Sequence, residues 1–582
     1  MAIGQHSEHG EEWRLGTELG DHQEHEIVER PAAARDLSSE RLGRPLQVVT
    51  VEHLGWVAIA VYATLTRLIA LGARPLNGVE ADHALYELEL TNTGAHAATF
   101  HPAYSGWIHL LTAATFVLGG ANDFTARIVF ALSGLVLIAM AFALRHNIGR
   151  AGGLALGAML TLSPSVIAFS RASATATPAA AMAIVTIAAF MAVKSRPAAV
   201  RAAALGLFAG LTIAANRAGF ATVLLMVAAL FPIGLWNLVT RKDVMLAIRV
   251  WLVRYRSYAL LVIAVAAVVW VLSQMVIAGG LRTREILAPV GQASQIGFDK
   301  GIGGTIARFV TGFIAGLRRG AGFYLPVLAL YEFMIALAGI FGAIVIIGGK
   351  VRSRFATWAL IWMALSVAYF LWSPRHDGGT ILFILMPAGL VGAIGVDRLH
   401  QSDGWRIARW PIAAIAALTL YVGAIANFVY DAPDASKAPW ARHANLFWGA
   451  SATTEQTRLY SRQAASGLAP ADATVFFDDE AREIGPPVRW YLRELRPTAT
   501  AEAATVVVSS GVPLANPDQT AATYHFDYAE GWRANFTGVR PDAVIRFLLS
   551  GRIWGPVTSD AITIQVRKPI ASAPTVILTP DR

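Results

Sequence analysis

Long apolar stretches alternate with short polar ones over most of this 582-residue chain. Between residues 53 and 430 these stretches reach about 20 residues, the length that an α-helix needs to cross the hydrocarbon core of a bilayer. The pattern therefore predicts a polytopic, α-helical membrane protein with about eleven transmembrane helices. They are expected near residues 53–72, 124–144, 152–170, 176–193, 200–216, 219–238, 258–279, 324–348, 355–372, 380–397 and 411–430.

A further apolar stretch at residues 104–120 is short, contains His109 and ends in two glycines. If it does not cross the membrane, most Lys and Arg residues of the short loops fall on one side, which the positive-inside rule makes cytoplasmic. We therefore expect a half-inserted helix at the outer interface of the plasma membrane. The same topology puts the N-terminus in the cytoplasm and the region after residue 430 outside.

The two ends of the chain are polar. Residues 1–50 lack the apolar core of a signal peptide and are expected to form a disordered cytoplasmic tail. Residues 51–430 form the membrane domain. Beyond it, short β-patterned runs and two helical runs predict a small, mixed α/β extracytoplasmic domain over residues 431–582, with strands near 474–479, 505–510, 523–528 and 562–568 and helices near 486–495 and 541–551.

Composition narrows the classes of function. Charged residues make up 15% of the chain, against about a quarter in soluble proteins. The net charge of +9 is spread over short loops instead of forming one basic stripe, so membrane lipid and not nucleic acid is the expected partner. The chain has no cysteine, which excludes disulfides and thiolate metal sites.

The segment VEADHALYELELTNTG (79–94) follows the first apolar run and is acidic. Helical spacing places Asp82, Tyr86 and Glu89 on one face, with apolar residues on another that can rest on lipid. A carboxylate at the rim of the bilayer is costly unless it is paired, hydrated or metal-bound. Asp82 is thus a candidate catalytic residue and Tyr86 a candidate substrate contact; the alternative is a solvated charged face.

His83 offers a second donor beside Asp82, and it precedes Glu87 by four residues. His83 and Glu87 could therefore share a metal ion. The candidate ligands of a divalent cation, magnesium or manganese, are Asp82 and His83. Two ligands alone do not define a metal site. The metal therefore stays an open alternative.

Other candidate groups lie at the outer ends of the predicted spans. His101 precedes the proline that opens the 104–120 helix, and Arg171 ends SPSVIAFSR. Arg375 and His376 adjoin in WSPRHDGG, where a guanidinium beside an imidazole suits a phosphate at the membrane surface. The alternatives are a hydrogen-bonded interface histidine at 101, a structural ion pair at Arg171, and interfacial anchoring at 372–379.

The order of these segments resembles the GT-C superfamily of membrane glycosyltransferases, which includes protein mannosyltransferases and lipid A aminoarabinose transferases. Within it, the chain is most similar to the family named for its association with flippase activity in N-glycosylation-type pathways. The resemblance covers roughly residues 50 to 570. The stretches that carry it are ADHALY (81–86), HPAYSGWIHLL (101–111), GANDFTARIVFALSGLVLI (120–138), SPSVIAFSR (163–171), PPVRWYLREL (486–495) and GRIWGPVTS (551–559).

The resemblance implies a transferase of the cell envelope that acts on a polyprenyl-phosphate-linked sugar entering from the outer leaflet, as in protein glycosylation. The acceptor is unknown. Asp82 matches the first-loop aspartate of the family, as a base or as a ligand to a divalent cation. Arg375 is expected on the donor phosphate, with Arg171 and Arg217 as further contacts.

Two departures from the family pattern keep a second hypothesis open. His83 replaces a usual glutamate, and ASATATP (172–178) lacks a second acid. Either another acid substitutes, or the chain is a non-catalytic lipid-glycan binding or assembly subunit whose C-terminal domain docks a protein partner. A transporter is less expected, because the predicted spans show no paired broken helices and few buried acids. The candidate substitutes are Glu80, Glu285, Asp299 and Asp377.

Overall fold

A computed structural model gives the architecture of the chain. It describes residues 50–91, 105–240, 244–278, 324–351, 353–372, 378–428, 444–445, 449–450, 452–466, 468, 473–515, 519–531, 540–550 and 558–568. His101, Glu285, Asp299 and the loop with Arg375, His376 and Asp377 lie outside the described residues, as does the predicted tail up to residue 49.

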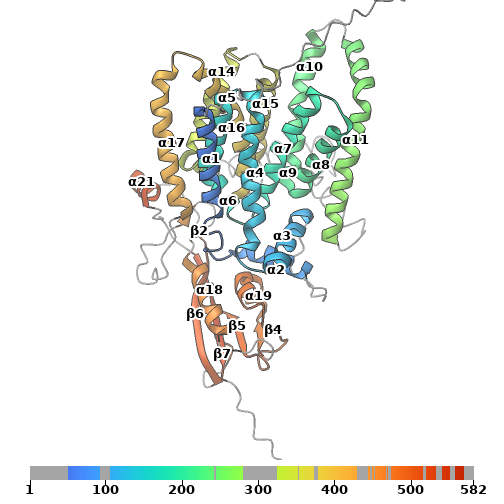
Figure 1. Ribbon diagram of the computed structural model, residues 1–582. Helices are drawn as coiled ribbons and strands as arrows, with labels where there is room; N and C mark the ends of the chain where they lie inside the picture. The colour runs from blue at the N-terminus through green and yellow to red at the C-terminus, as the bar shows by residue number, and fades with distance from the viewer. Residues whose placement is uncertain are drawn as a thin grey trace, which may run out of the picture. The chain divides into compact units, whose positions relative to one another are not determined.

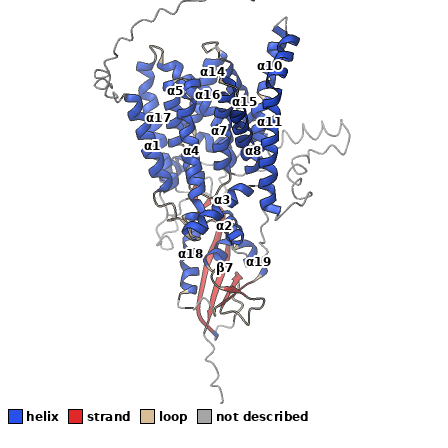
Figure 2. Ribbon diagram, turned by 45° about the vertical axis from the view of Figure 1, so that its right-hand side comes forward, coloured by secondary structure: helices blue, strands red, loops and turns tan. Residues whose placement is uncertain are grey.

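Helices dominate the part before residue 430, where Figures 1 and 2 show a bundle of long helices. Seven of the described helices are long and apolar enough to cross a membrane, or up to nine if each of two bent pairs is one span. The chain is therefore an integral membrane protein. The bundle region contains α1 (Val51–Leu68), α2 (Gly78–Thr91), α3 (Gly106–Gly119), α4 (Thr125–Ile148), α5 (Arg150–Leu162), α6 (Pro164–Ser170), α7 (Ala176–Ser195), α8 (Ala199–Ala215), α9 (Arg217–Ala228), α10 (Leu230–Thr240), α11 (Val244–Ala278), α14 (Phe333–Ile347), α15 (Arg354–Trp372), the 3₁₀ turn η1 (Gly378–Ile381), α16 (Leu382–His400) and α17 (Trp405–Phe428).

The remaining two predicted spans correspond to α1 and α8, which are 18 and 17 residues long. The count of eleven therefore stays a prediction. α3, in the predicted interfacial stretch, has 14 apolar-rich residues and is shorter than a span.

Among the seven described candidate spans, the one that contains α16 is the most buried, with 89% of its most apolar stretch inside the protein. Small residues let its neighbours approach closely, as is common between helices in membranes. At Gly392, an added Cβ would lie 2.7 Å from the Cβ of Ala338 on α14, too close for any larger side chain. This close contact packs α14 and α16 along each other.

Two of the spans are broken. α5 and α6 meet at 61° at Ser163, where Pro164 starts α6, because proline cannot continue the hydrogen-bond ladder of the preceding helix. The helix Tyr324–Leu330 meets α14 at 96° at Tyr331 and Glu332. The expectation that the spans contain no paired broken helices is therefore wrong.

The region after residue 443 contains the strands, which Figure 2 shows in red. A five-stranded sheet has the order β4-β3-β5-β7-β6, with β3 parallel to β4 and β5, and β7 antiparallel to β5 and β6. This confirms the predicted mixed α/β region. Its elements are β1 (Ala444–Asn445), β2 (Gly449–Ala450), α18 (Ala452–Ala465), β3 (Thr474–Phe477), α19 (Asp479–Ile484), α20 (Pro486–Tyr491), β4 (Arg496–Pro497), β5 (Val506–Ser510), β6 (Thr520–Gly531), α21 (Pro541–Ser550) and β7 (Thr558–Arg567).

Candidate active site on the first loop

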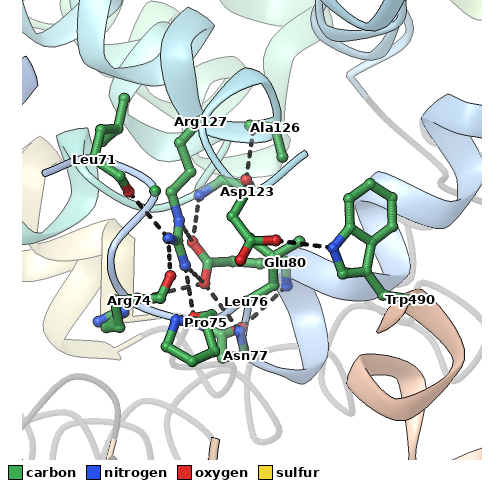
Figure 3. A network of polar contacts seen from close by, with 12 residues as sticks. Leu71, Arg74, Pro75, Leu76, Asn77, Glu80, Asp123, Ala126, Arg127 and Trp490 are labelled. Atoms are coloured by element: carbon green, nitrogen blue, oxygen red, sulfur yellow. Dashed lines mark hydrogen bonds and ion pairs between the residues drawn. The ribbon is translucent and has the colours of Figure 1, made fainter. Parts of the chain in front are cut away.

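A buried ion pair fixes the start of α2. The Nε and Nη2 groups of Arg127 on α4 donate to the two carboxylate oxygens of Glu80 at 2.9 and 2.7 Å, and both side chains are at most 2% exposed (Figure 3). Bidentate pairing of this kind is strong and directional. Arg127 also donates to the carbonyls of Leu71, Arg74 and Pro75, so one guanidinium holds the whole turn that leads into α2.

The carboxylate of Glu80 has further hydrogen-bond partners. Its carboxylate accepts from the backbone N–H groups of Asn77 and Ser173, each at 3.0 Å, and Arg74 lies 3.4 Å away. Burial alone would raise the pKa of Glu80, but the guanidiniums of Arg127 and Arg74 hold it at about 2. Glu80 is thus an ionised structural anchor, and neither of its oxygens is left for a substrate or a metal.

Asp82 follows two residues later and has a different environment. Its side chain is half-buried, and the described residues form no ion pair with it. Burial raises the pKa of Asp82, while the guanidinium of Arg489 on α20 counters that rise. A carboxylate with a raised pKa and no locked partner is better suited to accept a proton than Glu80 is.

A second buried cluster joins α2 to α3. Glu87 Oε1 lies 3.0 Å from His109 Nδ1, and the rings of His83 and Tyr86 pack edge-on against the His109 ring at 5.2 and 5.1 Å. Burial raises the pKa of Glu87 and lowers the pKa of His109, which favours the neutral form of each group. Burial also lowers the pKa of His83 to about 4.

The apolar side of α2 does not rest on lipid, contrary to our expectation. Ala81 and Ala84 are buried in a cluster with Phe116 of α3 and Trp490 of α20, and Leu85 and Leu88 pack against it. Protein contacts thus hold α2 on several sides, while Asp82 keeps partial exposure. Tyr86 is also buried, at the contact with His109.

The surroundings of Asp82 and His83 bear on the metal alternative. Among them, no three His, Asp or Glu side chains are placed to hold an ion. His83 packs against His109, whereas Asp82 is next to the charge of Arg489. The two proposed ligands are neighbours in sequence but have different surroundings.

Arg171 and Arg217, two of the predicted substrate contacts, lie in different parts of the bundle. Arg171 is buried and donates to the carbonyls of Thr66, Ile69 and Ala70, where it satisfies the carbonyl end of α1. Arg217 is half-buried at the start of α9. No described contact brings Arg171 or Arg217 to Asp82.

Sequence reasoning missed the residues that dock α20 on the first loop. Asp123 accepts from Trp490 Nε1 at 2.9 Å and from the hydroxyl of Tyr491 at 3.0 Å, and the Tyr491 hydroxyl accepts from the backbone N–H of Leu76. The Trp490 ring is fully buried against Phe116, with ring centroids 5.9 Å apart. Asp123 and Trp490 lie within two of the motifs quoted above, GANDFTAR and PPVRWYLREL, but nothing in either motif indicates that they meet.

Comparison with solved structures identifies the fold of the chain. The solved structure of ArnT from Cupriavidus metallidurans bound to undecaprenyl phosphate matches with a TM-score of 0.50 and 16% identity, over 78% of this chain and 93% of that one. The chain has the GT-C fold. The chain matches no protein-family model and no curated protein.

Two further solved structures are similar to this chain. ArnT in the apo state gives a TM-score of 0.49 at 15% identity, covering 79% of this chain and 93% of that one. The archaeal oligosaccharyltransferase AglB from Archaeoglobus fulgidus, in complex with an inhibitory peptide and a dolichol-phosphate, gives 0.48 at 12% identity, covering 79% and 69%.

Proposed function

We propose that the protein is a glycosyltransferase that moves a sugar from a polyprenyl-phosphate donor to an acceptor on the outer face of the membrane. The fold supports this, because it is shared with ArnT, whose solved structure holds undecaprenyl phosphate. The observation that carries the proposal is Asp82, a half-buried carboxylate without an ion pair among the described residues. It stands on a helix that buried polar contacts otherwise fix in place.

In the reaction, the acceptor hydroxyl attacks the anomeric carbon of the sugar and passes its proton to Asp82. The bond between that carbon and the phosphate oxygen breaks, and the polyprenyl phosphate leaves with the electron pair. A general base contributes typically about 10²–10⁴-fold to such a step. The charge of Arg489 counters the effect of burial on the pKa of Asp82 and so favours the ionised carboxylate that a general base needs.

The leaving phosphate needs positive charge nearby. Arg375 and His376 are proposed for this role, with Arg217 as a further contact. Arg171 is proposed only as a second-rank contact, because its guanidinium already serves three carbonyls. His101 and Tyr86 are proposed to border the substrate.

The substitution Asp82→Asn tests the proposal. It removes the base but keeps the shape of the side chain, so transfer should fall by about 100-fold or more. The matched control is Asp403→Asn, the same chemical change at an exposed residue that precedes α17. If Asp82→Asn transfers sugar at the wild-type rate while lipid binding is unchanged, Asp82 has no part in the chemistry.

A non-catalytic binding or assembly subunit is the second candidate. Glu80 favours this alternative. It is one of the acids that could replace the missing carboxylate, but both of its oxygens are bound by Arg127. Such a subunit would bind undecaprenyl phosphate but release no product from any polyprenyl-phosphate sugar. Under this second proposal, the C-terminal domain would dock a protein partner.

The divalent cation also stays a proposal, with Asp82 and His83 as ligands, and no step above passes through it. Transfer measured with and without EDTA, followed by added magnesium or manganese, tests it. Loss of transfer that either metal restores would support a metal requirement, and full transfer in EDTA would exclude one.

A further inference from the structure

A buried glutamate joins the two broken spans. Glu332 lies between the helix Tyr324–Leu330 and α14, at the 96° bend, and only 1% of its surface is exposed. Its Oε1 accepts from the hydroxyl of Ser163 at 2.8 Å and from the backbone N–H of Ser165 at 2.7 Å. Those serines are at the other break, between α5 and α6. One carboxylate oxygen thus ties the two breaks together.

The second oxygen of Glu332 has no such contact. Oε2 is buried and has no hydrogen-bond partner among the described residues, and no described Lys, Arg or His forms an ion pair with the carboxylate. A carboxylate inside a membrane protein is expensive unless it is paired. The contacts of Oε1 explain why Glu332 links the breaks, but they leave the charge without a counter-ion.

Other oxygen atoms lie close by in the chain. The hydroxyl of Ser165 is buried, and the backbone N–H of the same residue donates to Glu332. The helix Tyr324–Leu330 ends just before Glu332, and no described N–H of the turn that follows donates to the carbonyls of Leu328, Ala329 or Leu330. Carbonyls at the end of a helix carry partial negative charge.

From this set we infer that the joint between the broken spans binds a monovalent alkali cation, Na⁺ or K⁺. Carboxylate, hydroxyl and helix-end carbonyl oxygens are what such cations take as ligands at broken membrane helices. One carboxylate supplies one negative charge, which a monovalent ion balances. A proton on Oε2 would satisfy that oxygen alone, whereas a cation serves several oxygens at once.

The joint-bound cation is a separate claim from the transferase function, since Glu332 takes no part in the reaction proposed above. Its expected effect is on stability: an ion that binds the folded chain and not the unfolded one raises the unfolding temperature in a saturable way.

The experiment measures the thermal unfolding of the purified, full-length protein in detergent. Chloride salts of sodium, potassium and N-methyl-D-glucamine are compared at equal ionic strength, and at pH 6 and pH 8. We expect at least one alkali cation to raise the unfolding temperature by roughly 2 °C or more above the organic cation, with saturation. The isosteric variant Glu332→Gln should lose this difference.

A second variant keeps the test informative if Glu332→Gln does not fold. Ser165→Ala preserves the backbone contact to Glu332 but removes the buried hydroxyl, and should shift half-saturation to a higher cation concentration. Equal unfolding temperatures in all three salts overturn the inference. So does an unfolding temperature that follows pH but not the cation, which would assign a proton to Oε2. A rise of equal size in wild type and Glu332→Gln would show a cation bound elsewhere and would overturn it too.

Discussion

Glu80 and Glu332 are both buried glutamates at turns between helices, yet their surroundings differ. Glu80 has a bidentate arginine and two backbone donors, so both oxygens are satisfied and the charge is balanced. Glu332 has two donors on one oxygen, and no Lys or Arg among the described residues is paired with it. Full pairing indicates a structural anchor, and incomplete pairing indicates a place where something else binds.

Asp82 belongs with the incompletely paired group, although it is only two residues from Glu80. The anchor and the candidate base share one helix, and the rigidity of the first helps to hold the second in position. A site that must act on a membrane lipid benefits from this arrangement, because a displacement of about 1 Å can cost 10²-fold in rate.

The largest expected effect comes from breaking the satisfied pair. Arg127→Ala leaves the charge of Glu80 buried without its partner, which should lower the free energy of unfolding by about 3–5 kcal/mol. Chemical unfolding in detergent measures this loss. The double variant Glu80→Gln with Arg127→Met should recover a large part of it, because no unpaired charge remains. Equal stability of Arg127→Ala and wild type would contradict the role of Glu80 as anchor.

Acid should weaken the same pair. The pKa of Glu80 is about 2 in the folded chain, below the ordinary value of 4.5, so its contribution to stability is complete above pH 4.5 and is lost as pH falls toward 2. Unfolding temperatures from pH 6 to pH 3 should therefore decline more steeply in wild type than in Glu80→Gln. Equal declines of the unfolding temperature in the two proteins would show that the arginines do not keep Glu80 ionised.

A smaller effect is expected at the contact between α20 and the first loop. Trp490→Phe keeps an aromatic ring against Phe116 but removes the N–H that donates to Asp123, leaving one oxygen of a buried carboxylate unpaired. The expected loss is about 1–3 kcal/mol of unfolding free energy. Trp410→Phe, at an exposed tryptophan of α17, is the control and should change little. Equal losses in both variants would remove the Asp123 contact from the account.

The smallest change on stability is expected for Asp82→Asn, which affects no ion pair among the described residues. Surface and half-buried substitutions without such contacts usually stay within about 0.5 kcal/mol. Its unfolding temperature should match that of wild type even where transfer is lost. A large destabilisation would place Asp82 with Glu80 as a structural residue.

The sequence predicts those features that depend on local pattern. The apolar runs mark the long helices, the acidic 79–94 stretch corresponds to α2, and the alternating runs after residue 470 correspond to β3, β5, β6 and β7. Pro164 is a local signal for the first break. The second break, at Tyr331 and Glu332, has no glycine or proline, so its bend depends on packing that periodicity does not report.

The polar contacts were beyond the reach of sequence reasoning because their partners are distant in the chain. Glu80 and Arg127 are 47 residues apart, Ser163 and Glu332 are 169 apart, and Asp123 and Trp490 are 367 apart. The acids Glu80 and Glu87 look like Asp82 in the sequence. Only their burial and partners distinguish the anchors from the candidate base.

The most direct test of the central claim measures polyprenyl phosphate released from polyprenyl-phosphate sugars by the purified protein, for wild type and Asp82→Asn side by side. The account predicts release by wild type, a rate lower by about 100-fold or more in Asp82→Asn, and equal binding of undecaprenyl phosphate by both. Release by Asp82→Asn at the wild-type rate would contradict it.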